Sequence, residues 1–140
     1  MTDANAVRYF QDKLAYETSA REVVAAVKAG DKMTIVDVRR AEAYNKGHIV
    51  DALNLSLDDL ANASRTLDTA KLIVVYDWGP GSTESTRAAL SLASQGFRVR
   101  ELLGGFEYWM RMGLSIEGPD GIVKHRVADS MVTTAPVGWD

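Results

Sequence analysis

The chain has 140 residues, of which 46% are hydrophobic and 25% are charged, and its formal net charge is -3. These values are typical of one folded domain and argue against a disordered chain. An acidic chain without a basic cluster is a poor candidate for binding nucleic acid or an anionic membrane. No apolar run is long enough to span a bilayer, and the first residues do not resemble a signal peptide. We therefore expect a cytoplasmic protein with neither nucleic-acid nor membrane partners.

Two residue types that often carry chemistry are absent or sparse. The chain has no cysteine, which excludes disulfides, thiolate metal sites and every cysteine-based mechanism. Its two histidines, His48 and His125, lie far apart without a ligand-like spacing. We expect no metal and no cofactor.

The first 30 residues predict two helices. Three apolar residues recur on one face of the first helix: Val7, Phe10 and Leu14. Ser19 and Glu22 have the spacing of a capping box, which predicts that a second helix starts here and ends at Gly30. Three valines are expected on the buried face of this second helix: Val23, Val24 and Val27.

Shorter elements follow. Residues 33–38 predict a strand, and the polar stretch 39–46 predicts a short helix that Gly47 ends. Residues 52–55 favour a short strand, and residues 57–60 favour a helical turn.

Residues 72–76 give the clearest strand, because they are continuously apolar, as in a strand that is covered on both faces. A loop over 77–84 leads into a helix at about 85–95. Three residues of that helix should face inward: Ala88, Ala89 and Leu92.

The remaining elements complete an alternating pattern. Residues 98–102 predict a strand, and Gly104 and Gly105 turn the chain into a helix in which Trp109 packs in the core. Strands alternating with helices at this spacing predict an α/β fold with a parallel sheet between helical layers. The tail over 118–140 has no clear period and is expected either to pack as an extended arm or to be partly disordered.

The loop after the strand at 72–76 is the best candidate site. Successive loop amides and the start of a helix can converge on one point and make an anion-binding cradle. Parallel sheets place ligands at the carboxyl ends of their strands, so Asp77 should lie at the floor of this cradle. The loop residues that follow are Trp78, Gly79, Pro80, Gly81, Ser82, Thr83 and Glu84.

Several motifs in this order resemble the rhodanese family, a superfamily that includes related cysteine phosphatases. The matching segments are Ile35-Val36-Asp37-Val38-Arg39, Glu42, Gly47-His48-Ile49, Val74-Val75-Tyr76-Asp77, Gly96-Phe97, Gly104-Gly105-Phe106, Trp109 and Gly113-Leu114. The resemblance covers about residues 19–117. It implies a three-layer α/β/α domain with a mainly parallel central sheet, so we expect one domain over 1–140 with a C-terminal extension from 118.

The resemblance also implies a site with one decisive change. In the family, a cysteine after this strand takes a sulfane sulfur from a donor such as thiosulfate and passes the sulfur to a nucleophile. Asp77 stands at that cysteine's position, and a carboxylate cannot form the sulfur–sulfur bond of a persulfide. The loop also looks longer than usual, lacks Arg and Lys, and carries Glu84, whose charge would repel thiosulfate or phosphate.

Each candidate residue also has a structural interpretation. For Asp77 we prefer a carboxylate that caps the loop and helix amides. Asp37 and Arg39 are expected to form an ion pair with each other or with Glu42, and His48 is expected to be structural. Arg87 is a possible cation for a catalytic role of Asp77, and Trp78 could equally contact a ligand or shield the loop.

Three hypotheses for function remain open. The first is a non-catalytic binding or regulatory module, with an unknown protein partner or a small anion at the loop. The second is a hydrolase-type enzyme that uses Asp77 as its nucleophile or base. The third is a natural sulfurtransferase whose cysteine has been replaced by Asp77 in this chain.

Overall fold

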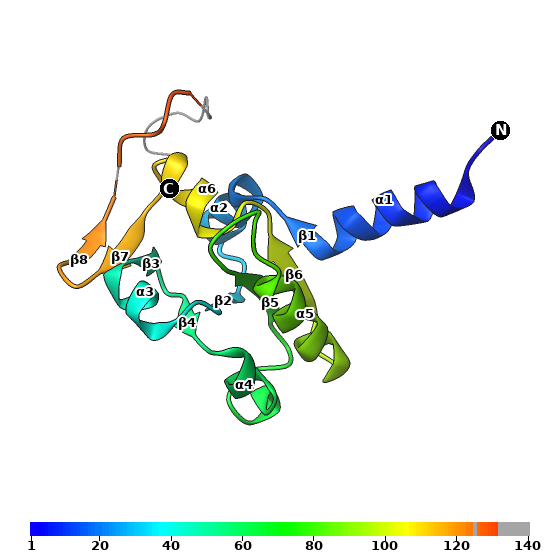
Figure 1. The fold of residues 1–140 in the computed structure, drawn as a ribbon, viewed down its shortest axis with the longest axis horizontal. Coiled ribbons are helices and arrows are strands. Elements are labelled where there is room, and N and C mark those ends of the chain that lie inside the picture. The colour runs from blue at the N-terminus through cyan, green and yellow to red at the C-terminus, as the bar shows by residue number, and fades with distance from the viewer. Residues whose placement is uncertain (125, 132–140) are drawn as a thin grey trace.

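The computed structural model describes residues 1–124 and 126–131. A five-stranded sheet lies at its centre, with strand order β1-β6-β5-β2-β4 and only parallel pairings (Figure 1). Its strands are β1 (Glu17–Thr18), β2 (Met33–Asp37), β4 (Leu53–Asn54), β5 (Leu72–Tyr76) and β6 (Val99–Leu102).

Helices cover both faces of this sheet, as the alternating pattern predicted. The helices on one face are α2 (Ala20–Lys28) and α6 (Gly105–Arg111). On the other face lie α4 (Leu57–Leu60), the 3-10 helix η1 (Ala63–Arg65) and α5 (Glu84–Ser94). A sixth helix, α3 (Ala41–Lys46), precedes the strand β3 (His48–Ile49).

The central strand β5 connects two hydrophobic clusters. Val74 and Tyr76 belong to the cluster beneath α2 and α6, whereas Ile73 and Val75 belong to the cluster beneath α4 and α5. Successive strand residues point to opposite faces, so a strand that is covered on both sides must be apolar throughout. The predicted α/β architecture with a parallel sheet between helical layers is confirmed.

Helix α2 starts as predicted but buries less than predicted. The Ser19 side chain accepts a hydrogen bond from the backbone amide of Glu22 at its start, and Val23 and Val24 are buried. The prediction for Val27 was wrong, because this side chain is 55% exposed. Val27 lies in the last turn of α2, beside a pocket that Trp109 also lines, and is not covered there.

The N-terminal helix α1 (Ala4–Tyr16) forms where the apolar spacing predicted it, but it buries none of its residues. The side chain of Asp3 caps it by accepting hydrogen bonds from the amides of Asn5 and Ala6. In Figure 1 it projects from the rest of the chain. Its periodicity therefore reflects an apolar face that the described residues leave exposed.

The tail begins with structure that the sequence did not reveal. Strands β3, β7 (Ile116–Gly118) and β8 (Gly121–Val123) form a small antiparallel sheet. Residues 118–123 thus complete a hairpin, whereas the prediction for the tail at 125 and 132–140 falls outside the described residues. Among the described helices, none is long and apolar enough to cross a membrane.

Candidate functional site at the loop after β5

Asp77 follows the last residue of β5 and is 2% exposed. One of its carboxylate oxygens accepts a hydrogen bond of 3.1 Å from the backbone amide of Gly79. The other accepts one of 2.8 Å from the amide of Ser85, in the first turn of α5. The carboxylate therefore occupies the point on which the loop and the helix start converge, which is the geometry of a cap.

The end of the loop, before α5, is polar and mostly open to solvent. The hydroxyl of Ser82 accepts a hydrogen bond of 3.3 Å from the amide of Glu84, and the Glu84 side chain is exposed. Thr83 precedes α5 but forms no capping hydrogen bond through its side chain. Asp77 thus supplies the side-chain cap that the residue directly before α5 does not provide.

The backbone of the loop is fixed from its other side by α6. The carbonyl oxygens of Asp77 and Trp78 accept hydrogen bonds of 2.9 and 2.8 Å from the amides of Phe106 and Glu107. Gly105 permits this close approach, because a Cβ atom there would lie 2.7 Å from the Asp77 carbonyl oxygen and its φ is +55°. Gly105 therefore lets the loop pack closely against the start of α6.

A buried ion pair lies beside the loop. Arg39 and Asp37 are 3% and 0% exposed, and their closest nitrogen–oxygen distance is 2.7 Å. Arg39 also donates to the Gly47 carbonyl at 2.6 Å, and the Tyr76 hydroxyl donates to the Asp37 carboxylate at 2.6 Å. Burial, followed by the Asp37 charge and hydrogen bond, raises the pKa of Tyr76 well above its ordinary value of 10.0.

The same arginine supports the exposed aromatic residue of the loop. The guanidinium carbon of Arg39 lies 4.0 Å from the ring centroid of Phe106 and 4.8 Å from that of Trp78. Cation–π attraction holds the Trp78 ring in place on this side. The side chain nevertheless remains 55% exposed, so Trp78 both covers Arg39 and presents an aromatic surface to solvent.

The other two predicted residues lie outside this arrangement. His48 is buried, stacks on Tyr44 with ring centroids 3.7 Å apart and contacts the Glu117 carboxylate at 3.5 Å. Arg87 is exposed on α5. Neither forms a hydrogen bond or an ion pair with Asp77 in the described structure. Glu42, which was the alternative partner of Arg39, likewise forms no ion pair with it there.

A groove that the sequence did not predict borders Trp78. It has a volume of about 710 Å³, and its lining includes Trp78, Phe106, Met110, Arg126 and Val127. The segment at 126–129 forms one wall, because Arg111 pairs with the Asp129 carboxylate at 2.8 Å and Arg126 donates to the Met110 carbonyl at 3.0 Å. No sequence motif predicts the position of this segment, because that position depends on contacts with residues of α6, which are distant in the sequence.

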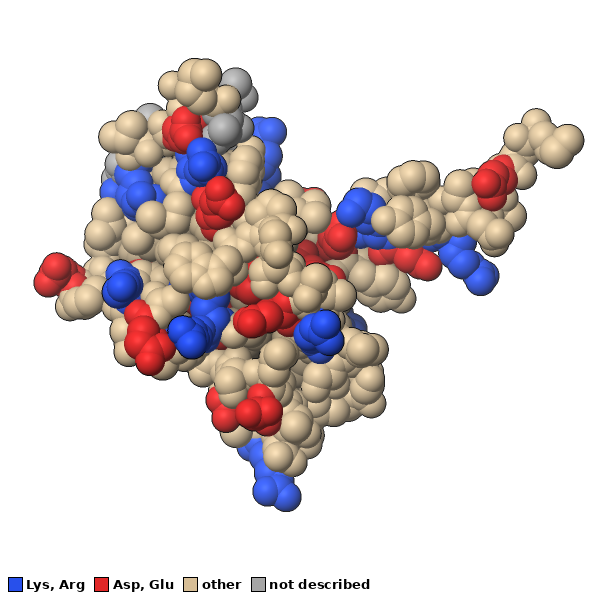
Figure 2. Space-filling view, in the orientation of Figure 1, with Lys and Arg blue, Asp and Glu red and all other residues tan. Residues whose placement is uncertain are grey.

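Charge and metal-ligand patterns add little to the site. Figure 2 shows acidic and basic side chains interspersed over the face in view, without a large patch of one sign. Within residues 1–124 and 126–131, no group of three or more His, Cys, Asp or Glu side chains could hold a metal ion.

Comparisons with known proteins agree with this architecture. The sequence model of the rhodanese-like domain family matches residues 19–112 of this chain. The thiosulfate sulfurtransferase GlpE of Coxiella burnetii is 38% identical over 94 residues, which cover 66% of this chain and 85% of the relative. The crystal structure of the BH2092 protein of Bacillus halodurans has a TM-score of 0.76 and 38% identity, and the match covers 84% of this chain and 87% of that one.

A third relative is a larger protein. The HTH-type transcriptional regulator Rv0324 of Mycobacterium tuberculosis is 31% identical over 96 residues, which cover 69% of this chain but only 42% of the relative. The family model spans β2, β4, β5 and β6 of the central sheet, the loop after β5 and α6. The chain belongs to the rhodanese-like domain family.

Proposed function

We propose that this chain is a binding module that does not transfer sulfur, because Asp77 stands at the position of the family's persulfide-forming cysteine. One observation carries the proposal: the two carboxylate oxygens of Asp77 already accept the amide hydrogens of Gly79 and Ser85. A negative charge belonging to the chain itself fills the cradle in which an anionic donor would bind.

The chemistry of sulfur transfer supports the same conclusion. A thiolate attacks the outer sulfur of thiosulfate, a sulfur–sulfur bond forms and sulfite leaves; cyanide then removes the outer sulfur as thiocyanate. A carboxylate cannot form the sulfur–sulfur bond, and the chain has no cysteine at any other position. Sulfur transfer is the activity in the names of the GlpE relatives, and a shared fold does not by itself carry that activity over to this chain.

Trp78 is the residue that we assign to partner binding. It is 55% exposed, Arg39 holds its ring, and it borders the groove of about 710 Å³ that Met110 and Val127 also line. Exposed aromatic residues beside grooves are favourable anchors for a protein partner. The similarity to part of a transcriptional regulator supports a regulatory role for this binding module.

A thiosulfate–cyanide assay tests the loss of activity. The parent chain should form no thiocyanate above the uncatalysed rate, whereas Asp77→Cys should form it if the cradle is intact. Asp77→Ser is the matched control, because it has the size of cysteine but no thiol. Thiocyanate formed catalytically by the parent would overturn the proposal.

Partner binding needs a separate test. A partner protein that binds the parent chain should not bind the Trp78→Ala variant. It should still bind the Leu90→Ala variant, which lacks an exposed apolar side chain of α5. A partner that tolerates Trp78→Ala would place the binding surface elsewhere.

The two other hypotheses have less support. A hydrolase that uses Asp77 would need an accessible carboxylate and a cation, but Asp77 is 2% exposed and Arg87 forms no hydrogen bond or ion pair with it. Replacement of a natural cysteine by Asp77 is tested by sequencing the source gene, where an aspartate codon would exclude it.

A further inference from the structure

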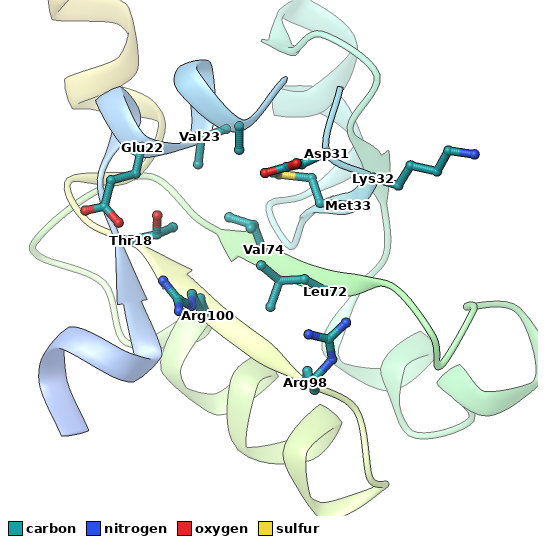
Figure 3. Close-up of a pocket in the computed structure, with 11 residues that line it drawn as sticks. Thr18, Glu22, Val23, Asp31, Lys32, Met33, Leu72, Val74, Arg98 and Arg100 are labelled. Carbon is teal, nitrogen blue, oxygen red and sulfur yellow. The ribbon is translucent and has the colours of Figure 1, made fainter. Parts of the chain in front are cut away.

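Another pocket lies on the α2 side of the sheet, at the starts of β2, β5 and β6 (Figure 3). Its volume is about 450 Å³, and small-molecule sites typically have about 300–1,000 Å³. Leu72, the first residue of β5, lines it, whereas Asp77 follows the other end of that five-residue strand. At about 3.3 Å per residue the two ends are roughly 13 Å apart, so this pocket is separate from the loop site.

Strand alternation explains the pocket's lining. Arg98 and Arg100 are two residues apart at β6, so both side chains project to the same face of the sheet, the one that α2 covers. Helix α2 has only nine residues and does not cover this face completely. Leu72, at the start of β5, therefore remains partly exposed. The floor of the pocket is therefore apolar, with two guanidinium groups along one side.

Opposite charges stand on opposite sides of this floor. Arg98 donates a hydrogen bond of 3.1 Å to the Ala70 carbonyl, and the partly buried Arg100 forms no ion pair with any described residue. Glu22 of α2 and Asp31 beyond its end line the other side. In Figure 3 the Asp31 carboxylate points into the pocket, whereas Lys32 points away from the other side chains.

We propose that this pocket binds a free α-amino acid with an apolar side chain. Its carboxylate would pair with Arg98 and Arg100, and its ammonium group with the carboxylates of Asp31 and Glu22. Its side chain would pack on Leu72 and the neighbouring apolar residues of the floor, which are Val23, Ala26, Met33 and Val74.

The charge pattern favours a zwitterion over a simple anion. A ligand that carries only a carboxylate would satisfy the arginines but would face the like charge of Asp31 across the pocket. A ligand with both charges forms charge-assisted hydrogen bonds on both sides. The apolar floor adds a requirement for a hydrophobic side chain, which glycine lacks.

The test is a titration of the full 15N-labelled chain with L-leucine, followed by amide chemical shifts. We expect saturable shifts at the pocket residues and none at the loop after β5. Three analogues each lack one recognised group: 4-methylpentanoate lacks the ammonium, 3-methylbutylamine lacks the carboxylate, and glycine lacks the side chain. Each should bind at least about tenfold more weakly than leucine.

Two variants check the assigned charges. Arg100→Gln and Asp31→Asn should each weaken leucine binding by about tenfold or more. Arg40→Gln, an exposed arginine outside the pocket, should leave leucine binding unchanged. The analogue series uses the unaltered chain, so it decides the question even if a variant fails to fold.

Three outcomes would overturn the proposal. They are the absence of shifts up to the solubility limit of leucine, equal binding of 4-methylpentanoate and leucine, and shifts that map to the loop around Asp77. The second outcome would indicate a general anion site, and none of the three depends on whether the chain transfers sulfur.

Discussion

The Asp77 carboxylate accepts a hydrogen bond of 2.8 Å from the backbone amide of Ser85, eight residues later in the chain. Helix N-termini usually obtain such a bond from the residue directly before them, but Thr83 does not provide one. The end of β5 is thereby joined to the start of α5 through a side chain. Asp77 consequently occupies the point on which the amides of the loop and the start of α5 converge.

Replacing this carboxylate should reduce stability. Asn has one acceptor oxygen, so Asp77→Asn would leave the amide of either Gly79 or Ser85 without its partner. We expect the free energy of unfolding to fall by about 1–3 kcal/mol in urea denaturation. Asp68→Asn is the control: only one oxygen of this exposed residue accepts an amide, from Ala70, and asparagine can replace it. Equal effects of the two substitutions would contradict the capping role.

The backbone contact between the loop and α6 makes a second prediction. A methyl group in Gly105→Ala would lie 2.7 Å from the Asp77 carbonyl oxygen and 2.9 Å from the Gly79 nitrogen. Thermal unfolding should show a loss of about 2 kcal/mol beyond that of Gly30→Ala. Gly30 has φ +82° but no atom within 4 Å of the added carbon, so it measures backbone strain alone. A loss no larger than that of Gly30→Ala would argue against close packing here.

Tyr76 should give the chain an alkaline stability dependence. Its pKa in the folded chain is raised above 10.0, first by burial and then by Asp37, so the unfolded chain releases this proton at lower pH than the folded chain. Stability from Tyr76 is therefore complete below about pH 10 and declines as the pH rises towards the folded pKa, by up to about 1.4 kcal/mol per pH unit.

Urea denaturation across this pH range checks the prediction. Tyr76→Phe should flatten the decline of stability with pH. A smaller slope should remain, because burial also raises the pKa of Tyr44. Tyr9→Phe alters an exposed side chain and should follow the parent curve. An unchanged slope in Tyr76→Phe would show that this residue does not govern the decline.

Arg39 should control both stability and the position of Trp78. Arg39→Lys removes the paired hydrogen bonds to Asp37 and the flat guanidinium group beneath the Trp78 ring. We expect a loss of about 2 kcal/mol or more and a shift of the Trp78 indole resonance. Arg40→Lys, at the exposed neighbouring position, should change neither quantity. An unmoved indole resonance in Arg39→Lys would mean that other contacts hold the ring.

Local patterns in the sequence were sufficient to predict the main elements. The continuously apolar run predicted β5 with its observed bounds, and Ser19 with Glu22 predicted the start of α2. Both signals are local: one depends on burial from two sides and the other on a cap within one turn. An ion pair was also expected for Asp37 and Arg39, either with each other or with Glu42, and the structure shows the pair between Asp37 and Arg39.

Other features depend on contacts between distant segments. Val27 is exposed because it lies in the last turn of α2, beside an open pocket. The spacing of the valines does not reveal where this cover ends. Strands β7 and β8 are three residues each and form by pairing with β3 and with each other, so no period marks them. The capping role of Asp77 was expected, but the Ser85 amide as its partner and the groove beside Trp78 required the structure.

The most direct test of the account is intact-mass spectrometry after incubation with thiosulfate. The parent chain should keep its mass, because Asp77 cannot hold a sulfane sulfur and the chain has no cysteine. Asp77→Cys should gain the mass of one sulfur atom, which dithiothreitol should remove, and Asp77→Ser should gain nothing. A reducible gain of one sulfur atom on the parent chain would contradict the account.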